Sequence, residues 1–290
     1  MGRIRTVAVF PTMFTLANLI CGFFAIVVAA RVERPTELNP PEVVDKISFS
    51  NPKTFMQQLD PKSQTHNVML SGWLIFLAMV FDALDGYVAR LARSSTDFGA
   101  QLDSLCDVVS FGVAPGFLLV KMCPAFTYSH DKIWLIAAAF AACAALRLAR
   151  FNVETGENDD HMNFSGLPSP AAAASIAGFA ILFYELRQSS TPLMYAAEID
   201  QAVQMGLPFF ALGVALLMVS RIPYPHIVNQ MFRGQRSFAH VVLLVFAFVF
   251  IMSFRGYSVP VLCAAFVLVG PIRYAWHRLF LREQSHDPIF

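Results

Sequence analysis

The sequence predicts an all-α fold, a polytopic integral membrane helix bundle of about eight transmembrane helices in a single domain over residues 1–290. Composition is the first reason, because 56% of the residues are hydrophobic and only 14% are charged, which is too apolar for a soluble domain of this length. Apolar runs also recur at lengths that cross a bilayer. Finally, basic residues gather in alternate connections between these runs.

Eight apolar runs are expected to be transmembrane helices, and proline interruptions leave a count of seven open. In chain order they cover 9–30, 68–91, 104–122, 133–151, 169–186, 206–222, 238–254 and 258–276. The first run lacks a clear small-residue cleavage site, so we expect it to be retained in the membrane. Pro168 and Pro170 fit the start of the fifth run, where a missing N–H is harmless. The stretch 273–290 mixes arginine with aromatic residues and is expected to lie along the membrane surface.

Two connections stand out. The segment 32–67 is polar, holds five prolines and is long for a connection. We expect it outside the cytoplasm, as a lid or decoration without a part in the chemistry, with 42–49 and 53–59 as candidate short helices. The connection 152–167 is acidic and contains glycine, and it is expected on the cytoplasmic side.

The placement of positive charge predicts the orientation. If both termini are cytoplasmic, the short inside segments hold twelve arginines, and the outside connections other than 32–67 hold four basic residues. The twelve are Arg3, Arg5, Arg90, Arg93, Arg147, Arg150, Arg221, Arg233, Arg236, Arg273, Arg278 and Arg282; the four are Lys121, Lys132, Arg187 and Arg255. Basic residues accumulate on the cytoplasmic side of membrane proteins, which favours this orientation.

The cysteines and histidines exclude other kinds of site. The five cysteines are scattered and odd in number, which argues against a disulfide framework or a zinc site. The seven histidines show no ligand spacing. Ser110 and Ser169 have no base at a recognisable spacing, so a serine nucleophile is not expected.

Four carboxylates between residues 82 and 107 lie in or beside segments that are otherwise apolar. Asp82 and Asp85 are three residues apart, Asp103 and Asp107 are four apart, and on helices each pair shares a face. A carboxylate near the bilayer centre costs about 2.5–3.5 kcal/mol on insertion scales. Divalent cations remove the mutual repulsion of such a group, so a metal site is the simplest explanation.

Small residues and an arginine accompany these acids. On the second span, a cluster within about 140° of arc comprises Asp82, Asp85, Gly86, Ala89 and Arg90. On the third, a cluster within about 80° comprises Gly99, Asp103 and Asp107. The short connection between the two spans predicts antiparallel neighbours, so the two acidic faces are expected to meet.

These groups together predict phosphoryl-transfer chemistry. Hard oxygen ligands select Mg²⁺, Mn²⁺ or Ca²⁺. Two such ions about 3.5–4 Å apart assist in-line displacement at phosphorus. Residues with almost no side chain let a ligand approach the backbone, and Arg90 suits a phosphate, so a nucleotide diphosphate is the expected ligand.

The pattern D-x-x-D-G-x-x-A-R-x₈-G-x₃-D-x₃-D over residues 82–107 resembles the signature of the CDP-alcohol phosphotransferases at every fixed position. The resemblance implies transfer of a phosphatidyl or related group from a CDP-linked donor to an alcohol, with release of CMP. It implies that the four acids hold two divalent metal ions, either Mg²⁺ or Mn²⁺. It also implies that Asp107 is the general base. Contacts with the CDP part are implied for Asp82, Gly86, Ala89, Arg90 and Gly99.

Stretches around the signature are similar to membrane-embedded phosphatidylserine synthases of the bacterial and archaeal type. They are TLANLICG at 15–22, DVVSFGVAPG at 107–116, RLARFNV at 147–153, GLPSPAA from Gly166, and MVSRIPYP at 218–225. This resemblance implies CDP-diacylglycerol and L-serine as substrates, a homodimer, no nucleic acid, and a prokaryotic cell (inner) membrane with the site facing the cytoplasm. The long 32–67 segment and Gln101, where glutamate is common, depart from that pattern.

The acceptor site is expected near the cytoplasmic ends of later spans. Arg147 and Arg150 share a helix face with Asn152 just beyond, and such a pair suits a serine carboxylate or the donor's phosphates. Arg221 is a further candidate. For all three arginines the alternative is that the side chain extends to the lipid headgroups and anchors its helix in the membrane. Thr15 and Asn18 are expected to make hydrogen bonds between helices.

Two alternatives stay open on the sequence. Within the same chemistry the acceptor is another alcohol, namely glycerol phosphate, inositol phosphate or choline. From another class, a divalent-cation transporter also carries intramembrane acids. A bare ion pathway does not require the glycines, alanine and arginine of the signature.

Overall fold

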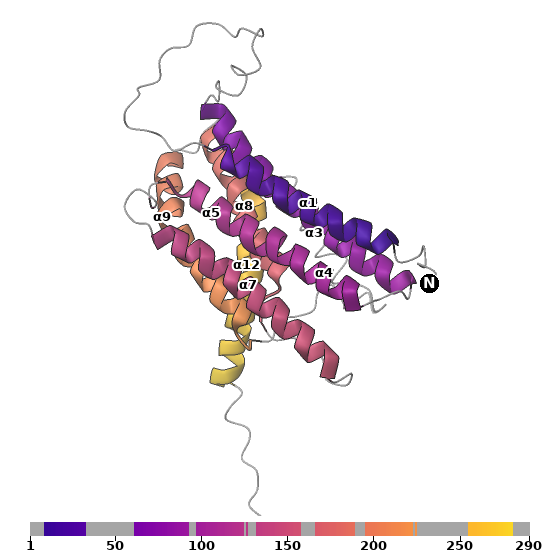
Figure 1. Ribbon diagram of the computed structural model, residues 1–290. Helices are drawn as coiled ribbons and strands as arrows, with labels where there is room; N and C mark the ends of the chain where they lie inside the picture. The colour runs from indigo at the N-terminus through magenta and orange to yellow at the C-terminus, as the bar shows by residue number, and fades with distance from the viewer. Residues whose placement is uncertain are drawn as a thin grey trace, which may run out of the picture.

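The structure is a computed structural model that describes residues 9–32, 61–92, 97–124, 126, 132–157, 166–188, 195–222, 224 and 255–280. These residues form helices and no strand (Figure 1). The principal α-helices are α1 (Val9–Ala30), α3 (Pro61–Ala92), α4 (Asp97–Asp107), α5 (Ala114–Met122), α7 (Lys132–Glu157), α8 (Ser169–Gln188), α9 (Ala196–Val219) and α12 (Ser258–Phe280). A π-helix, η2 (Val108–Val113), joins α4 to α5, and a 3₁₀ turn, η3 (Arg255–Tyr257), precedes α12.

Within the described residues, seven helical stretches are long and apolar enough to cross a membrane. The all-helical, polytopic fold is therefore confirmed. The predicted span at 238–254 and the candidate helices at 42–49 and 53–59 lie outside the described residues. Helix α8 begins at Ser169 with Pro170 next to it, as the proline positions predicted.

Three helices begin well before their apolar runs, among them α4, which starts at Asp97 rather than at 104. Helix α3 starts at Pro61 rather than at 68, so residues 61–67 belong to a helix and not to the long connection. Helix α9 starts at Ala196 rather than at 206. The polar extension of α9 is stabilised because Asp200 accepts two hydrogen bonds of 3.0 Å from Arg187 of α8. Hydropathy indicates only which residues lie in the membrane. A helix can extend beyond those residues when its polar side chains find partners.

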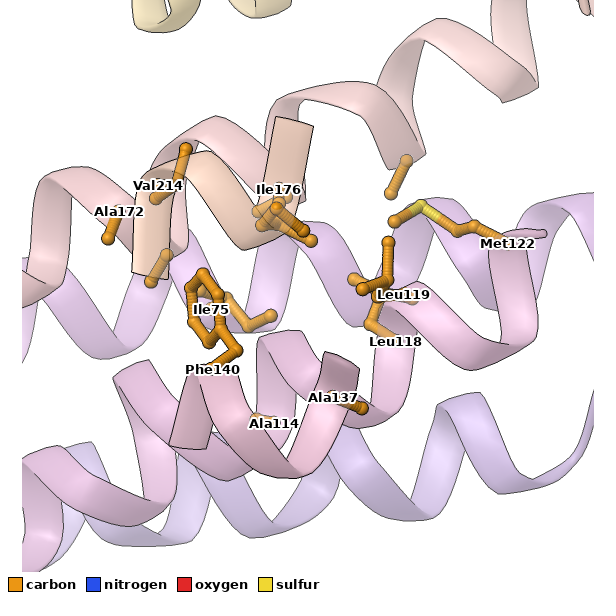
Figure 2. Packing of buried hydrophobic residues seen from close by; sticks show 14 of the residues in the cluster. Ile75, Ala114, Leu118, Leu119, Met122, Ala137, Phe140, Ala172, Ile176 and Val214 are labelled. Carbon is orange, nitrogen blue, oxygen red and sulfur yellow. The ribbon is translucent and has the colours of Figure 1, made fainter. Parts of the chain in front are cut away.

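Helix α8 is the central helix of the bundle. It packs against α3, α5, α9 and α12, and its buried side includes Ala172, Ala173, Ala177 and Ala180. Figure 2 shows Ile176 of α8 in the same buried cluster as side chains from α3, α5, α7 and α9. Those labelled include Ile75, Leu118, Leu119, Phe140 and Val214. Small residues let several helix backbones approach α8 closely.

Glycines permit a similarly close approach between the third span and α7. A Cβ on Gly112 would stand 3.1 Å from the Cβ of Ala144, and one on Gly116 would stand 2.9 Å from the carbonyl oxygen of Ala137. The two glycines are four residues apart, so both lie on the face that meets α7. Small residues at this spacing are typical of tightly packed membrane helices.

The third span is not the uninterrupted α-helix that the sequence predicted. Its hydrogen-bond pattern changes to π immediately after Asp107 and returns to α at Ala114. Pro115, at the start of α5, has no N–H to donate to an earlier carbonyl, which coincides with the end of the π-turn. Single π-turns inside helices occur frequently at functional sites.

Candidate functional site

Three of the four predicted acids come together. Asp82 of α3 and Asp103 and Asp107 of α4 each offer one carboxylate oxygen, and these oxygens lie within 4.8 Å of one another. Asp107 is buried, and the other two are half-buried. The Oδ1 atom of Asp103 is buried without a hydrogen-bond partner among the described residues. A buried, unpaired carboxylate oxygen within such a group fits a cation, because a cation is the partner that the group lacks.

Asp85 lies outside this group, although all four acids were expected together. Its carboxylate is buried and accepts a hydrogen bond from the hydroxyl of Thr15 in α1. The difference arises from packing, because Asp85 Oδ2 is bonded to α1 and this bond sets the orientation of the carboxylate. The role of Asp85 as a metal ligand stays a prediction.

Helix α1 also contacts Asp107. The side-chain amide of Asn18 donates to Asp107 Oδ1 at 3.0 Å, and Ser110 Oγ donates to the carbonyl oxygen of Asn18 at 3.0 Å. Gly22 allows this closeness, because a Cβ there would stand 2.7 Å from Ser110 Cα. The prediction that Thr15 and Asn18 make hydrogen bonds between helices is confirmed.

The second and third spans are neighbours as predicted, but α3 contacts the third span mainly beyond α4. Helix α1 packs along α3 and also contacts α4, whereas α3 packs on η2 and α5 rather than along α4. The short connection therefore does not make α3 and α4 neighbours over their full length. The acidic faces still meet, because α1 bridges the two helices at the level of Asp85 and Asp107.

The predicted CDP-contacting residues are only partly described. Gly86 in α3 is exposed, and apart from its own chain neighbours and the nearby backbone of its helix, no described atom lies within 4 Å of the position that a Cβ would take. The open space beside Gly86 leaves room for a ligand next to the acids. Gly99 is half-buried in α4. Ala89 and Arg90 belong to the backbone of α3, and their side chains lie outside the described residues.

Arg147 is the candidate acceptor-site residue that reaches the acids. Its Nη1 donates to Ser169 Oγ at 2.8 Å, at the start of α8. The half-buried guanidinium is also close enough to Asp82 and Asp107 to interact with them electrostatically. A fixed positive charge beside the acidic group is where an anionic substrate group would bind.

Of the other three candidates, two are more exposed than Arg147, and one bonds to a different helix. Asn152 is exposed and donates to Ser104 Oγ of α4 at 2.9 Å, so it connects α7 to α4. Arg150 is half-buried in α7, and Arg221 is exposed just beyond α9. Asn152 thus bonds to the helix that carries Asp103 and Asp107, and its part in acceptor binding stays a prediction.

Backbone hydrogen bonds tie the segment before α8 to the end of α9. Gly166 N–H donates to the carbonyl of Ile222 at 2.9 Å, and Leu167 N–H donates to that of Leu217 at 3.0 Å. Gly166 has a φ of +96°, and a Cβ there would stand 2.5 Å from the carbonyl oxygen of Met218. Only glycine fits this position without strain. These bonds fix Ser169, and through it Arg147, relative to α9.

Sequence reasoning missed two residues that shape the site, Ser104 and Ser110. Ser110 holds the backbone of Asn18, and Ser104 bonds to Asn152. For Ser110 the usable signal was its position three residues after Asp107, in a span where hydroxyl groups are few. Nothing in the sequence paired Ser104 with a residue 48 positions away.

The fold and the site define a class: a polytopic helical membrane protein with a group of converging carboxylates, set in its spans, that could hold a divalent cation. The sequence profile of the CDP-alcohol phosphatidyltransferase family matches residues 8–219, and the chain belongs to this family. Family membership confirms the resemblance that the acidic signature indicated. It also decides against the divalent-cation transporter.

Several similar proteins carry related names. The CDP-diacylglycerol–serine O-phosphatidyltransferase of Methanocaldococcus jannaschii is 36% identical over 201 residues, which cover 69% of this chain and 82% of that protein. The protein of the same name from Helicobacter pylori is 30% identical over 215 residues, covering 73% of this chain and 82% of its own. The archaetidylserine synthase of Methanothermobacter thermautotrophicus is 37% identical over 157 residues, covering 53% of this chain and 57% of that protein.

Proposed function

We propose that this protein is a CDP-diacylglycerol–serine O-phosphatidyltransferase, which transfers the phosphatidyl group from CDP-diacylglycerol to L-serine and releases phosphatidylserine and CMP. The observation that supports the chemistry is the group formed by Asp82, Asp103 and Asp107, with Arg147 beside it. The choice of serine is supported by the names of the similar archaeal and bacterial proteins.

The residues present fit a divalent cation, and we propose Mg²⁺ or Mn²⁺ as the cofactor, with two ions as the family resemblance implies. Asp82, Asp103 and Asp107 would hold it, and Asp85 would join them through Oδ1 while Thr15 keeps its bond to Oδ2. The unpaired Oδ1 of Asp103 supports this assignment. When bound, the metal neutralises negative charge on the pyrophosphate of the donor.

Asp107 acts as the general base in this proposal. Its carboxylate accepts the proton of the serine hydroxyl as the serine oxygen forms a bond to the phosphorus that carries the lipid. The bond from that phosphorus to the CMP oxygen breaks, and the electron pair leaves with CMP. Asn18 supports the role because its N–H group fixes one oxygen of Asp107 and leaves the other oxygen for the substrate.

The remaining site residues bind the two substrates. Gly86, Ala89, Arg90 and Gly99, together with Asp82, contact the CDP part, and the open space at Gly86 supports this assignment. Arg147 binds the serine carboxylate or the lipid phosphate. Arg150, Asn152 and Arg221 are the remaining candidates for that part of the site.

The cellular setting follows from the same assignment. We place the protein in a prokaryotic cell (inner) membrane, with the acidic site open to the cytoplasm and with two copies forming a homodimer. A site within the spans lets the acyl chains of CDP-diacylglycerol stay in the bilayer while the headgroup reacts.

An acceptor panel tests the function. Purified protein in detergent is supplied with Mn²⁺ or Mg²⁺ and CDP-diacylglycerol, and CMP release is followed with serine, glycerol phosphate, inositol phosphate or choline. We expect release with serine and phosphatidylserine as the lipid product. Release with another acceptor and none with serine would keep the chemistry and refute the substrate.

A further inference from the structure

One face of α1 carries two buried polar side chains in an otherwise apolar span. Thr15 and Asn18 are three residues apart, so they lie on the same side of the helix, and they are 3% and 0% exposed. Polar groups are rarely buried in a membrane helix unless hydrogen bonds satisfy them. Their partners therefore indicate what this face does.

The partners are two acids from two different helices. Thr15 donates to Asp85 of α3, and Asn18 donates to Asp107 of α4. A second bond holds this face in place, because Ser110 Oγ donates to the carbonyl oxygen of Asn18. Helix α1 thus fixes side chains on both sides of the acidic site.

The amide of Asn18 has a further feature. A carboxylate only accepts hydrogen bonds, so the NH₂ group of Asn18 must face Asp107 and Oδ1 must face elsewhere. That Oδ1 atom is buried and has no partner among the described residues. It lies at most about 5 Å from Asp107 Oδ1, because the bond to Nδ2 is 3.0 Å and the amide group itself is short. An acceptor left unpaired at this position matches a ligand that brings its own donors.

We propose that Thr15 and Asn18 are positioning residues of the acidic site. They set the orientations of Asp85 and Asp107, and Asn18 Oδ1 accepts a hydrogen bond from the hydration shell of the bound cation. This inference rests on the proposed function, because it assumes that the acids bind a divalent metal. Outer partners of metal ligands orient those ligands, and losing one weakens metal binding by about 10–100-fold.

A purely structural role for this face makes a different prediction. Ser71 of α3 supplies the comparison, because its buried Oγ donates to the carbonyl oxygen of Ala25 in α1 at 2.9 Å. The bond joins the same two helices, away from the acids. If Thr15 and Asn18 only hold helices together, removing them should resemble removing the Ser71 hydroxyl.

The test measures Mn²⁺ binding to the full-length protein in detergent, by calorimetry and by the electron paramagnetic resonance signal of free Mn²⁺. The variants are Asn18→Leu, Thr15→Val, Thr15→Ser and Ser71→Ala. We expect Mn²⁺ affinity to fall by about 10–100-fold in the first two variants, to be largely restored by Thr15→Ser, and to be unchanged in Ser71→Ala. The melting temperature is measured alongside, since all the variants that lose a buried bond can lower it.

Each outcome decides the inference. If Asn18→Leu and Thr15→Val bind Mn²⁺ as Ser71→Ala does, the positioning role is wrong while the proposed function stands. If the unmodified protein binds no Mn²⁺ and releases no CMP, both fail together. Should Asn18→Leu not fold, the near-isosteric Thr15→Val and its rescue by Thr15→Ser decide the matter alone.

Discussion

Replacing Gly22 with alanine is expected to disturb the acidic site without touching an acid. A Cβ at this position would stand 2.7 Å from Ser110 Cα, whereas ordinary contact begins at 3.4 Å. Because a backbone atom cannot turn aside, α1 and η2 must separate by at least 0.3 Å to reach the closest tolerated contact, 3.0 Å, and by 0.7 Å to reach an ordinary one. Such overpacking costs roughly 1–3 kcal/mol of stability. The movement also carries Asn18 from Asp107, and a misplacement of about 1 Å lowers turnover by roughly 10²-fold.

The assay compares the melting temperature and CMP release of Gly22→Ala with those of a matched control. Gly213 in α9 serves as the control, because no described atom lies within 4 Å of its Cβ position. Gly213→Ala should keep both properties of the unmodified protein. Parental stability and parental turnover in Gly22→Ala would show that α1 is not held against η2 as described, and the reasoning would be refuted.

Three further predictions concern the proposed chemistry. Asp107→Asn should lower CMP release by about 10²–10⁴-fold, because the general base is lost, although the new amide oxygen can still accept the hydrogen bond from Asn18. A nearly unaffected rate would show that Asp107 is not the base. Exhaustive chelation should abolish CMP release, and added Mn²⁺ or Mg²⁺ should restore it; full turnover with chelator present would contradict a metal cofactor. Arg147→Lys keeps the charge but not the planar donors, so KM for serine or for CDP-diacylglycerol should rise by about 10–100-fold; two unchanged KM values would place Arg147 outside substrate binding.

The general architecture could be predicted because its signals are local. Apolar runs of spanning length located the seven described spans, and the spacing of Asp103 and Asp107 placed both on one face. Proline at 170 marked the start of α8. Each of these inferences uses residues a few positions apart, for which helical geometry leaves little freedom.

What could not be predicted depends on partners far away in the sequence. The orientation of Asp85 depends on Thr15, which lies 70 positions earlier, and the orientation of Asn152 depends on Ser104. The early start of α9 depends on the pairing of Asp200 with Arg187 in another helix. A sequence shows that such groups need partners, but only the packing of helices decides which partners they find.

The π-turn between Asp107 and α5 has a consequence for how this chain tolerates change in length. Inserting a residue into Val108–Val113 would turn α4 by about 100° relative to α5 and swing its carboxylates away from Asp82, whereas removing one would let the π-turn close to ordinary α-helix. The core on the other side of the turn, around Leu118 and Leu119, would keep its place. This six-residue stretch is therefore expected to tolerate shortening better than lengthening, because it sets the angle between the acidic residues of α4 and the buried core of α5.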